Sequence, residues 1–287
     1  MTQTTQDKRG ILLPNYDSTY NSLYPTGNKP SSTLLSRLDL TAGLPVGSGA
    51  GSWGFGAQSG ASITVANDGT YNYLRGQYPI DVGGISGAGD NYIYGGYTPA
   101  VLQQELYVTV YARQANSYRH GCKFTKFLGK NTTGYANTTF GLDYTEIDNG
   151  SIQYIAYGDG TGTTNDTQNG MALYTPNYIG IGRAGTLPQT IQRSGVFSSA
   201  SWGTGWHKFQ IHIKQNSGTS SLNEVNDGLV ELYVDGVMKA RAINIFNRHW
   251  SNEFIESIGF FGYGRGATQA WEIHMRDITV SLNGWVD

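Results

Sequence analysis

The segment 205–240, GWHKFQIHIKQNSGTSSLNEVNDGLVELYVDGVMKA, most constrains the fold, because two alternating strands and a tight hairpin follow one another in it. Apolar residues at every second position are typical of a strand with one buried face. The expected buried rows are Phe209, Ile211 and Ile213 in the first strand, and Val230, Leu232 and Val234 in the second. Asp235-Gly236 then supplies the positive-φ residues of a type I′ turn. The segment therefore predicts antiparallel β-structure.

The composition agrees with a β protein rich in turns. Charged residues make up 14% of the 287 residues, well below the usual share of about a quarter, while Gly, at 40, is about twice as frequent as average. Long amphipathic helices need more Glu, Lys, Ala and Leu. Strand signals recur at short intervals, at 62–65, 71–77, 106–113, 123–128, 139–144, 151–157 and 178–181, and again from 207 onward. This spacing predicts an all-β, two-sheet antiparallel sandwich.

Two segments fall outside this strand pattern. Residues 1–35 are polar and carry spaced aromatic residues at Tyr16, Tyr20 and Tyr24, so we expect an extended N-terminal arm that docks on a neighbouring surface. Residues 36–287 would form one sandwich domain. The stretches 158–170 and 182–204 are predicted to be long loops, which either carry function or cap the ends of the sandwich.

Several partners and locations are not expected. The net charge is −2 without a basic tract, which argues against nucleic acid as a partner. No apolar run approaches the roughly 18 residues of a membrane span, and the first residues, MTQTTQDKRGILLPN, lack the pattern of a signal peptide. We therefore expect a cytoplasmic start and no membrane partner. Cys122 is the single cysteine and is interpreted as a buried structural thiol.

Several segments resemble a known family. W-H-x-F-x-I-x-I-K-x-N, followed by D-G-x-V-x-L-Y-V-D-G, resembles the late strands of concanavalin A-like jelly rolls, the family of lectins, laminin-G domains and polysaccharide lyases. ITVANDGTYNYLRGQYP, which brings Arg75 before Tyr-Pro, and LYVTVYAR with KFTKFLG are similar to its earlier strands, and IGFFGYGRG and WEIHMRDITVS to its last ones. The similarity spans residues 60–281. It implies a jelly roll that meets carbohydrates or surfaces, and it fixes no activity.

The acidic motif of glycoside hydrolases on this fold, E-x-D-x-x-E, is incomplete. Glu146 and Asp148 begin it, but Ser151 stands where the second catalytic Glu belongs. A retaining mechanism needs two carboxyl groups about 5 Å apart. Because Asn-Gly at 149–150 is itself a hairpin signal, we interpret the segment as a turn.

The requirements of a polysaccharide lyase are also met only in part. Such an enzyme needs a base, a group that neutralises the uronate carboxylate and a proton donor. Gln210-Ile211-His212 matches the Q-I-H motif of one alginate-lyase family, but R-x-E-x-L-R and Y-F-K-A-G-x-Y-x-Q are absent. We interpret the tripeptide as a coincidence of an alternating strand, and no catalytic residue is assigned. If that strand lies in an outer sheet, His212 is expected to be solvated.

A glycan-binding face is predicted from the alternation in LYVTVYAR. Val108, Val110 and Ala112 would face the core, leaving Tyr107, Thr109, Tyr111 and Arg113 on the opposite side. Tyr rings stack on sugars, and Arg supplies planar hydrogen-bond donors. The candidate glycan-binding residues are Tyr111, Arg113, Lys126, Tyr154, Tyr157, Tyr263 and Arg265. The alternative is that exposed tyrosines only stabilise the sheet through cross-strand pairs.

No cofactor is expected, although the resemblance implies that a structural calcium ion could bind. Its oxygen ligands would come from Asp39 and Asp277, or from Asp159 and Asp166 in the first long loop. The sequence contains no ligand ladder of EF-hand type, and its five histidines form no zinc pattern. Solvated aspartates are the alternative.

Three functions remain open. The first is a non-catalytic structural or adhesive protein resembling tailed-phage virion components such as capsid decorations, fibres or tails. We expect such a protein to assemble in the host cytoplasm, to form a homo-oligomer, to contact other virion subunits through the arm and to bind polysaccharide or a cell-surface glycan. The second is a lyase acting on a uronate polymer, and the third is a carbohydrate-binding module. The fold is compatible with all three.

Overall fold

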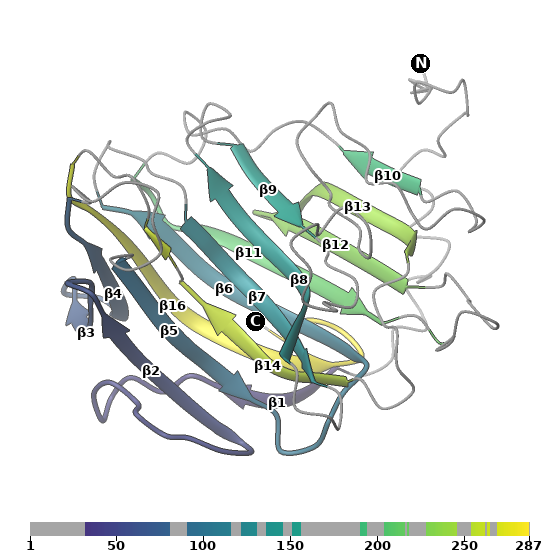
Figure 1. Ribbon diagram of the computed structural model, residues 1–287, viewed down its shortest axis with the longest axis horizontal. Helices are drawn as coiled ribbons and strands as arrows, with labels where there is room; N and C mark the ends of the chain where they lie inside the picture. Colours follow the sequence, from purple (N-terminus) through teal and green to yellow (C-terminus); the bar gives the residue numbers. More distant parts are fainter. Residues whose placement is uncertain are drawn as a thin grey trace.

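The computed structural model describes the chain as strands joined by turns, without a helix among the described residues. These are residues 32–80, 91–115, 122–130, 136–145, 151–155, 190–193, 204–215, 217, 228–245, 254–261, 263–264 and 269–286. Figure 1 shows two layers of strands, with β5, β14, β7 and β8 drawn in front of β16, β6 and β11. The described part of the chain has no helix that is long and apolar enough to cross a membrane.

The first layer is a nine-stranded antiparallel sheet. Its strands, in spatial order, are β10 (Thr190–Arg193), β13 (Val237–Ile245), β12 (Gly228–Val234), β11 (His207–Lys214), β6 (Glu105–Gln114), β16 (Trp271–Leu282), β4 (Asn72–Tyr78) and β3 (Ser62–Asn67). The ninth strand, β1 (Thr33–Arg37), pairs with β16. Since β6 pairs with β11 on one side and β16 on the other, strands far apart in the sequence meet at the centre of this sheet.

The second layer is a seven-stranded antiparallel sheet. Its strands, in order, are β14 (Phe254–Phe260), β5 (Asn91–Thr98), β15 (Tyr263–Gly264), β7 (Cys122–Lys130), β8 (Ala136–Thr145) and β9 (Ser151–Ile155), with β2 (Ser52–Gln58) paired to β5. The predicted all-β sandwich of two antiparallel sheets is therefore confirmed. β8 and β9 pair antiparallel up to Thr145 and Ser151, while residues 146–150, interpreted as a turn, lie outside the described residues.

The core lies between the two sheets and is made of alternating apolar side chains from both. Val108 and Val110 of β6 and Ile211 of β11 are fully buried, and they belong to the same cluster as Ile93 and Phe127 from the other sheet. Burying each such side chain contributes roughly 1.5–3 kcal/mol. The alternation that predicted the buried rows of β6 and β11 is confirmed.

The predicted hairpin joins β12 to β13. Asp235 has a φ of 52° and Gly236 a φ of 77°, the two positive values of a type I′ turn. The carboxylate of Asp235 also accepts a hydrogen bond from the backbone N–H of Lys208 at 2.9 Å and lies 2.6 Å from His207 Nδ1. The turn residue therefore also ties the hairpin to the start of β11.

Three sequence predictions concern segments where the structure adds or leaves out detail. Residues 1–31 of the predicted arm and the strand expected at 178–181 lie outside the described residues, while residues 33–35 belong to β1. The prediction of a loop without structure at 182–204 is wrong, because the segment contains β10. This strand forms by pairing with β13, a non-local contact that the four residues TIQR do not reveal.

Candidate functional site

The outer face of the nine-stranded sheet carries the polar side chains of β4, β6, β11 and β16. On β6, Val108, Val110 and Ala112 belong to the buried core. The residues that alternate with them therefore point outward, as predicted: Tyr107, Thr109, Tyr111 and Arg113. The strand register places Arg113 beside His274 and Tyr111 beside Arg276. The same register places Arg75 on the other side of His274.

Two arginines and four aromatic rings form what we call the arginine–aromatic cluster: Arg113, Arg276, Tyr71, Tyr73, Tyr111 and Trp206. The guanidinium carbon of Arg276 lies 3.7 Å from the ring centre of Tyr71, 4.6 Å from that of Tyr111 and 4.8 Å from that of Trp206. That of Arg113 lies 4.5 Å from the Trp206 ring and 5.2 Å from the Tyr73 ring. A cation and the face of an aromatic ring attract each other, so the guanidinium groups hold the rings in place.

Asp68, in the turn between β3 and β4, attaches that turn to the cluster. Its carboxylate accepts hydrogen bonds from the backbone N–H of Tyr71 at 2.9 Å and of Thr70 at 3.2 Å. It also accepts a hydrogen bond from the side chain of Trp206 and lies 3.5 Å from the guanidinium of Arg113. The Tyr71 hydrogen bond is the main reason why the pKa of Asp68 lies below its usual value. A short turn thus positions both Tyr71 and Trp206.

His274 of β16 lies beneath this cluster and is 5% exposed. Arg113 Nε donates to His274 Nδ1 at 3.2 Å. Since a guanidinium can only donate, Nδ1 must be the acceptor and Nε2 must carry the proton, which faces Glu272 at 3.0 Å. Burial lowers the pKa of His274, and the nearby Arg113 lowers it further. The imidazole is therefore neutral at pH 7, and both of its nitrogens are engaged.

Glu272 is the acceptor shared by this group. It receives hydrogen bonds from Arg75 Nε at 2.9 Å, from Gln77 Nε2 at 2.8 Å and from His274. The hydrogen bonds from Arg75 are the main cause of its pKa falling to about 2. An ionised carboxylate with this many donors is a poor base at neutral pH, so its role here is to fix the orientation of its neighbours.

A second histidine cluster lies on the other side of β6. His212 Nδ1 is 2.9 Å from Glu231 Oε2, and Nε2 is 2.8 Å from Glu105 Oε1. The ring of Tyr107 stacks on the imidazole at 4.0 Å, and Trp285 meets it edge-on. Burial opposes the charged form, but the hydrogen bonds to Glu105 and Glu231 outweigh it and raise the pKa of His212.

The expectation that His212 would be solvated is therefore wrong. It shares the outer face with Gln210, as the Q-I-H alternation requires, but only 1% of it is exposed, because Tyr107 and Trp285 cover it. An imidazole held between two carboxylates has no lone pair to offer a substrate. The structure supports the interpretation of this tripeptide as part of a sheet.

The predicted glycan-binding residues that the structure describes belong to strands of both sheets. Tyr111 and Arg113 lie together on the outer face of the nine-stranded sheet. Three others belong to strands of the seven-stranded sheet: Lys126 in β7, Tyr154 in β9 and Tyr263 in β15. Tyr157 and Arg265 lie outside the described residues. Strand pairing decides to which sheet each residue belongs, and the alternation within a strand does not indicate this pairing.

Residues that the sequence did not single out complete the site. They are Tyr71, Tyr73, Trp206, His274 and Arg276. A signal was present in WEIHMRD, where Glu272, His274 and Arg276 alternate and so share one face. The position of Trp206 had no such signal, because it depends on where the chain enters β11.

The aspartates proposed as calcium ligands have other partners. Asp39 accepts hydrogen bonds from Thr41 N at 2.8 Å and Thr41 Oγ1 at 2.7 Å, and Asp277 pairs with Arg276. Within the described residues, no three His, Cys, Asp or Glu side chains gather as a metal site. The structural calcium ion at Asp39 and Asp277 therefore stays a prediction. Asp159, Asp166 and the side chain of Cys122 lie outside the description.

Comparisons with known proteins establish the fold. No protein-family model matches this chain, and no curated protein does. Among solved structures, alginate lyase vAL-1 from Chlorella virus is similar with a TM-score of 0.61 and 12% identity, over 86% of this chain and 98% of that one. The endo-beta-1,4-glucuronan lyase from the fungus Trichoderma reesei follows with a TM-score of 0.52 and 9% identity, over 78% and 89%. The jelly-roll sandwich expected from the resemblance is thereby confirmed.

Proposed function

We propose that this protein binds an acidic glycan on the outer face of its nine-stranded sheet, at the arginine–aromatic cluster. The observation that carries the proposal is the packing of Arg113 and Arg276 against Tyr71, Tyr111 and Trp206. Two proteins of the same fold are named as lyases of alginate and of glucuronan, which agrees with this class of ligand.

The cluster has the two chemical features that an acidic sugar needs. Tyr71 is 42% exposed, and the guanidinium of Arg276 behind it holds the ring face available for stacking on sugar C–H groups. Arg75 and Arg113 are partly exposed and supply planar donors to a carboxylate. Because the rings are already fixed, little side-chain entropy is lost on binding.

The arrangement favours binding over catalysis. A lyase needs a base with a free lone pair, but His274 uses its lone pair to accept from Arg113, and His212 lies between two carboxylates. Lyase chemistry is the second candidate, because Tyr111 beside Arg276 could supply a phenol and a carboxylate neutraliser. It would require Tyr111 to act without either histidine.

The biological setting that we propose is an adhesive virion component assembled in the host cytoplasm. The polar N-terminal segment with its spaced tyrosines supports docking to other virion subunits or to further copies of this chain. Removing residues 2–32 leaves β1 intact. Gel filtration of that shortened chain should show a folded sandwich that no longer associates, and unchanged association would contradict a docking arm.

The binding proposal is tested with alginate and glucuronan hexasaccharides by calorimetry, while ultraviolet absorbance follows any unsaturated product. We expect binding without absorbance, and we expect Tyr111→Ala to weaken it about tenfold to a hundredfold, since a central aromatic commonly contributes a few kcal/mol. The control is Tyr94→Ala. Tyr94 lies on the opposite sheet and is about as exposed as Tyr71, so this variant should bind the acidic hexasaccharides normally. Turnover by the wild type would favour the lyase, and the lack of any binding would refute the proposal.

A further inference from the structure

The other outer face of the sandwich, on the seven-stranded sheet, has a groove of about 780 Å³ along β2, β5 and β14. Strand pairing aligns Gly96 of β5 with Gly54 of β2 on one side and with Gly259 of β14 on the other. Because these positions lack side chains, backbone forms the floor. We call this the glycine-floored groove.

One wall of the groove is the loop at residues 45–49. It is held against the edge of β2 by a bridge between Val46 and Gly54 and by a hydrogen bond from Phe55 N to Pro45 O at 3.0 Å. A Cβ at Gly54 would lie 1.8 Å from the carbonyl oxygen of Gly47, so only glycine permits this contact. The wall is therefore fixed by the backbone of both segments.

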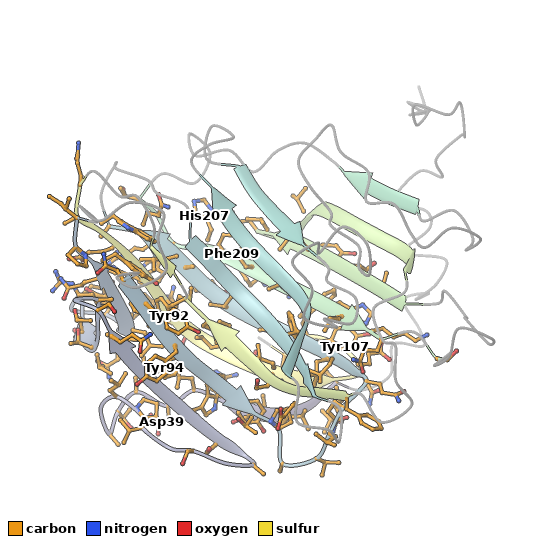
Figure 2. The ribbon with its side chains drawn as sticks, in the orientation of Figure 1. Asp39, Tyr92, Tyr94, Tyr107, His207 and Phe209 are labelled. Carbon is orange, nitrogen blue, oxygen red and sulfur yellow. The ribbon has the colours of Figure 1, made fainter. Side chains whose placement is uncertain are left out.

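The other wall carries two tyrosines of β5, Tyr92 and Tyr94, which Figure 2 labels along that strand. Their ring centres are 5.8 Å apart, and Tyr94 is 47% exposed. The Tyr94 ring rests on Gly56 of β2, where a Cβ would come within 2.6 Å of the ring. This glycine fixes the ring in a position where one face can receive a ligand.

The charge of the groove differs from that of the arginine–aromatic cluster. The described residues that line it include no Asp, Glu, Lys or Arg, and their side-chain polar groups are hydroxyls, among them Ser48, Ser52, Thr98 and Ser257. None of the described lining residues offers a cation to an acidic ligand. Stacking rings, hydroxyls and backbone amides match a ligand that has apolar C–H faces and hydroxyl groups but no charge.

We propose that the glycine-floored groove is a second carbohydrate site, which takes a neutral glycan chain along the Tyr92 and Tyr94 wall. Its volume lies within the range of roughly 300–1,000 Å³ that is usual for small-ligand sites. The two sites lie on opposite faces of the sandwich and use different chemistry. This proposal therefore does not depend on the acidic-glycan function of the other face.

The test is calorimetric titration of the full chain with neutral hexasaccharides, cellohexaose and mannohexaose, beside alginate hexasaccharide. We expect at least one neutral hexasaccharide to bind, and Tyr94→Ala to weaken it about tenfold or more without changing alginate binding. Tyr94→Phe keeps the ring and should bind nearly as the wild type does. Gly56→Ala keeps Tyr94 but displaces its ring, so it should also weaken neutral-glycan binding.

Three outcomes would overturn the proposal. They are no binding of either neutral hexasaccharide at millimolar concentration, normal binding by folded Tyr94→Ala, and equal loss of neutral-glycan binding in Tyr111→Ala, which alters the other face. If Tyr94→Ala does not fold, Ser257→Trp, which fills the groove from β14, takes its place. Failure of alginate binding alone would count against the acidic-glycan function and leave this site standing.

Discussion

His274 and His212 lie on the same outer face, on the two strands that flank β6, and their surroundings favour the neutral form of His274 and the charged form of His212. His274 accepts a hydrogen bond from Arg113, and burial lowers its pKa. His212 faces Glu105 and Glu231, whose hydrogen bonds raise its pKa. The difference teaches that burial of a histidine does not decide its protonation. The partner does: a cation that can only donate requires a neutral ring, while two carboxylates stabilise a charged one.

The same comparison separates a candidate site from a structural element. Tyr73 stacks on His274 and is buried, but the rings that pack on Arg276 in the same cluster, those of Tyr71, Tyr111 and Trp206, are exposed or half-buried. Around His212, Tyr107 and Trp285 close over the imidazole. We therefore propose ligand binding for the first cluster and a structural role for the second.

The largest expected effect comes from removing each histidine. His212→Ala leaves the buried carboxylate of Glu231 without its imidazolium, and breaking a buried ion pair in this way costs about 3–5 kcal/mol. His274→Ala removes a neutral ring and should cost less, about 1–3 kcal/mol for hydrogen bonds lost by buried groups. Urea unfolding at pH 7 measures both free energies. If His274→Ala lost as much stability as His212→Ala or more, the assignment of a neutral His274 and a charged His212 would be contradicted.

The next effect is the pH dependence of stability, where the two histidines should act in opposite directions. The raised pKa of His212 means that its contribution is complete below the unfolded value of 6.5 and is lost as pH rises through the folded value. The lowered pKa of His274 means that its contribution is present above 6.5 and is lost as pH falls through the folded value. For each histidine, the slope of the free energy of unfolding against pH approaches about 1.4 kcal/mol per pH unit between its two pKa values.

Single variants isolate these two slopes. In His274→Gln, the free energy of unfolding should fall as pH rises above 6.5, because His212 still titrates. In His212→Gln, it should fall as pH drops below 6.5, because His274 still titrates. Equilibrium unfolding between pH 5 and pH 9 measures both. Slopes of the same sign would show that one of the two protonation states is misassigned.

The smallest effect is expected from Arg75→Met, at the rim of the first cluster. The Arg75–Glu272 pair is partly exposed, so its loss should lower stability at pH 7 by less than about 1 kcal/mol. Glu272, whose pKa is about 2 mainly because of Arg75, should then protonate at higher pH. The acid limb of the stability curve, which lies between pH 4.5 and 2 in the wild type, should shift upward. If the acid limb did not shift, the low pKa of Glu272 would have to come from its hydrogen bonds with Gln77 and His274 instead.

Much of the sheet structure could be predicted from the sequence, and the omissions share a physical cause. β4, β6 and β11 alternate apolar and polar residues, which is a local signal. β2 (SWGFGAQ) and β5 (NYIYGGYT) were not predicted, because glycine disfavours strands and breaks the alternation. These strands form through pairing with their neighbours. Three of the glycines that interrupt the alternation, Gly54, Gly95 and Gly96, also line the groove.

The candidate site was predicted only where one strand contains it. The alternation within β6 placed Tyr111 and Arg113 on one face. Four other members come from three other segments: Arg276 from β16, Tyr71 and Tyr73 from the turn before β4 and from β4, and Trp206 from the position just before β11. Their meeting depends on strand order and on the Asp68 turn. A sequence shows which residues share a face of one strand, but pairing between distant strands determines which faces lie together.

The position of β6 has a consequence for the synthesis of this protein. Its contacts to β11 and β16 join residues 107 and 161 positions apart, as in Glu105 with His212 and Arg113 with His274. A ribosome adding about 5–20 residues per second needs on the order of ten seconds to make the second partner. Until then, both edges of an apolar strand lack their native neighbours and are open to pairing with other chains. The nascent chain, rather than the finished sandwich, is therefore the form most in need of a chaperone.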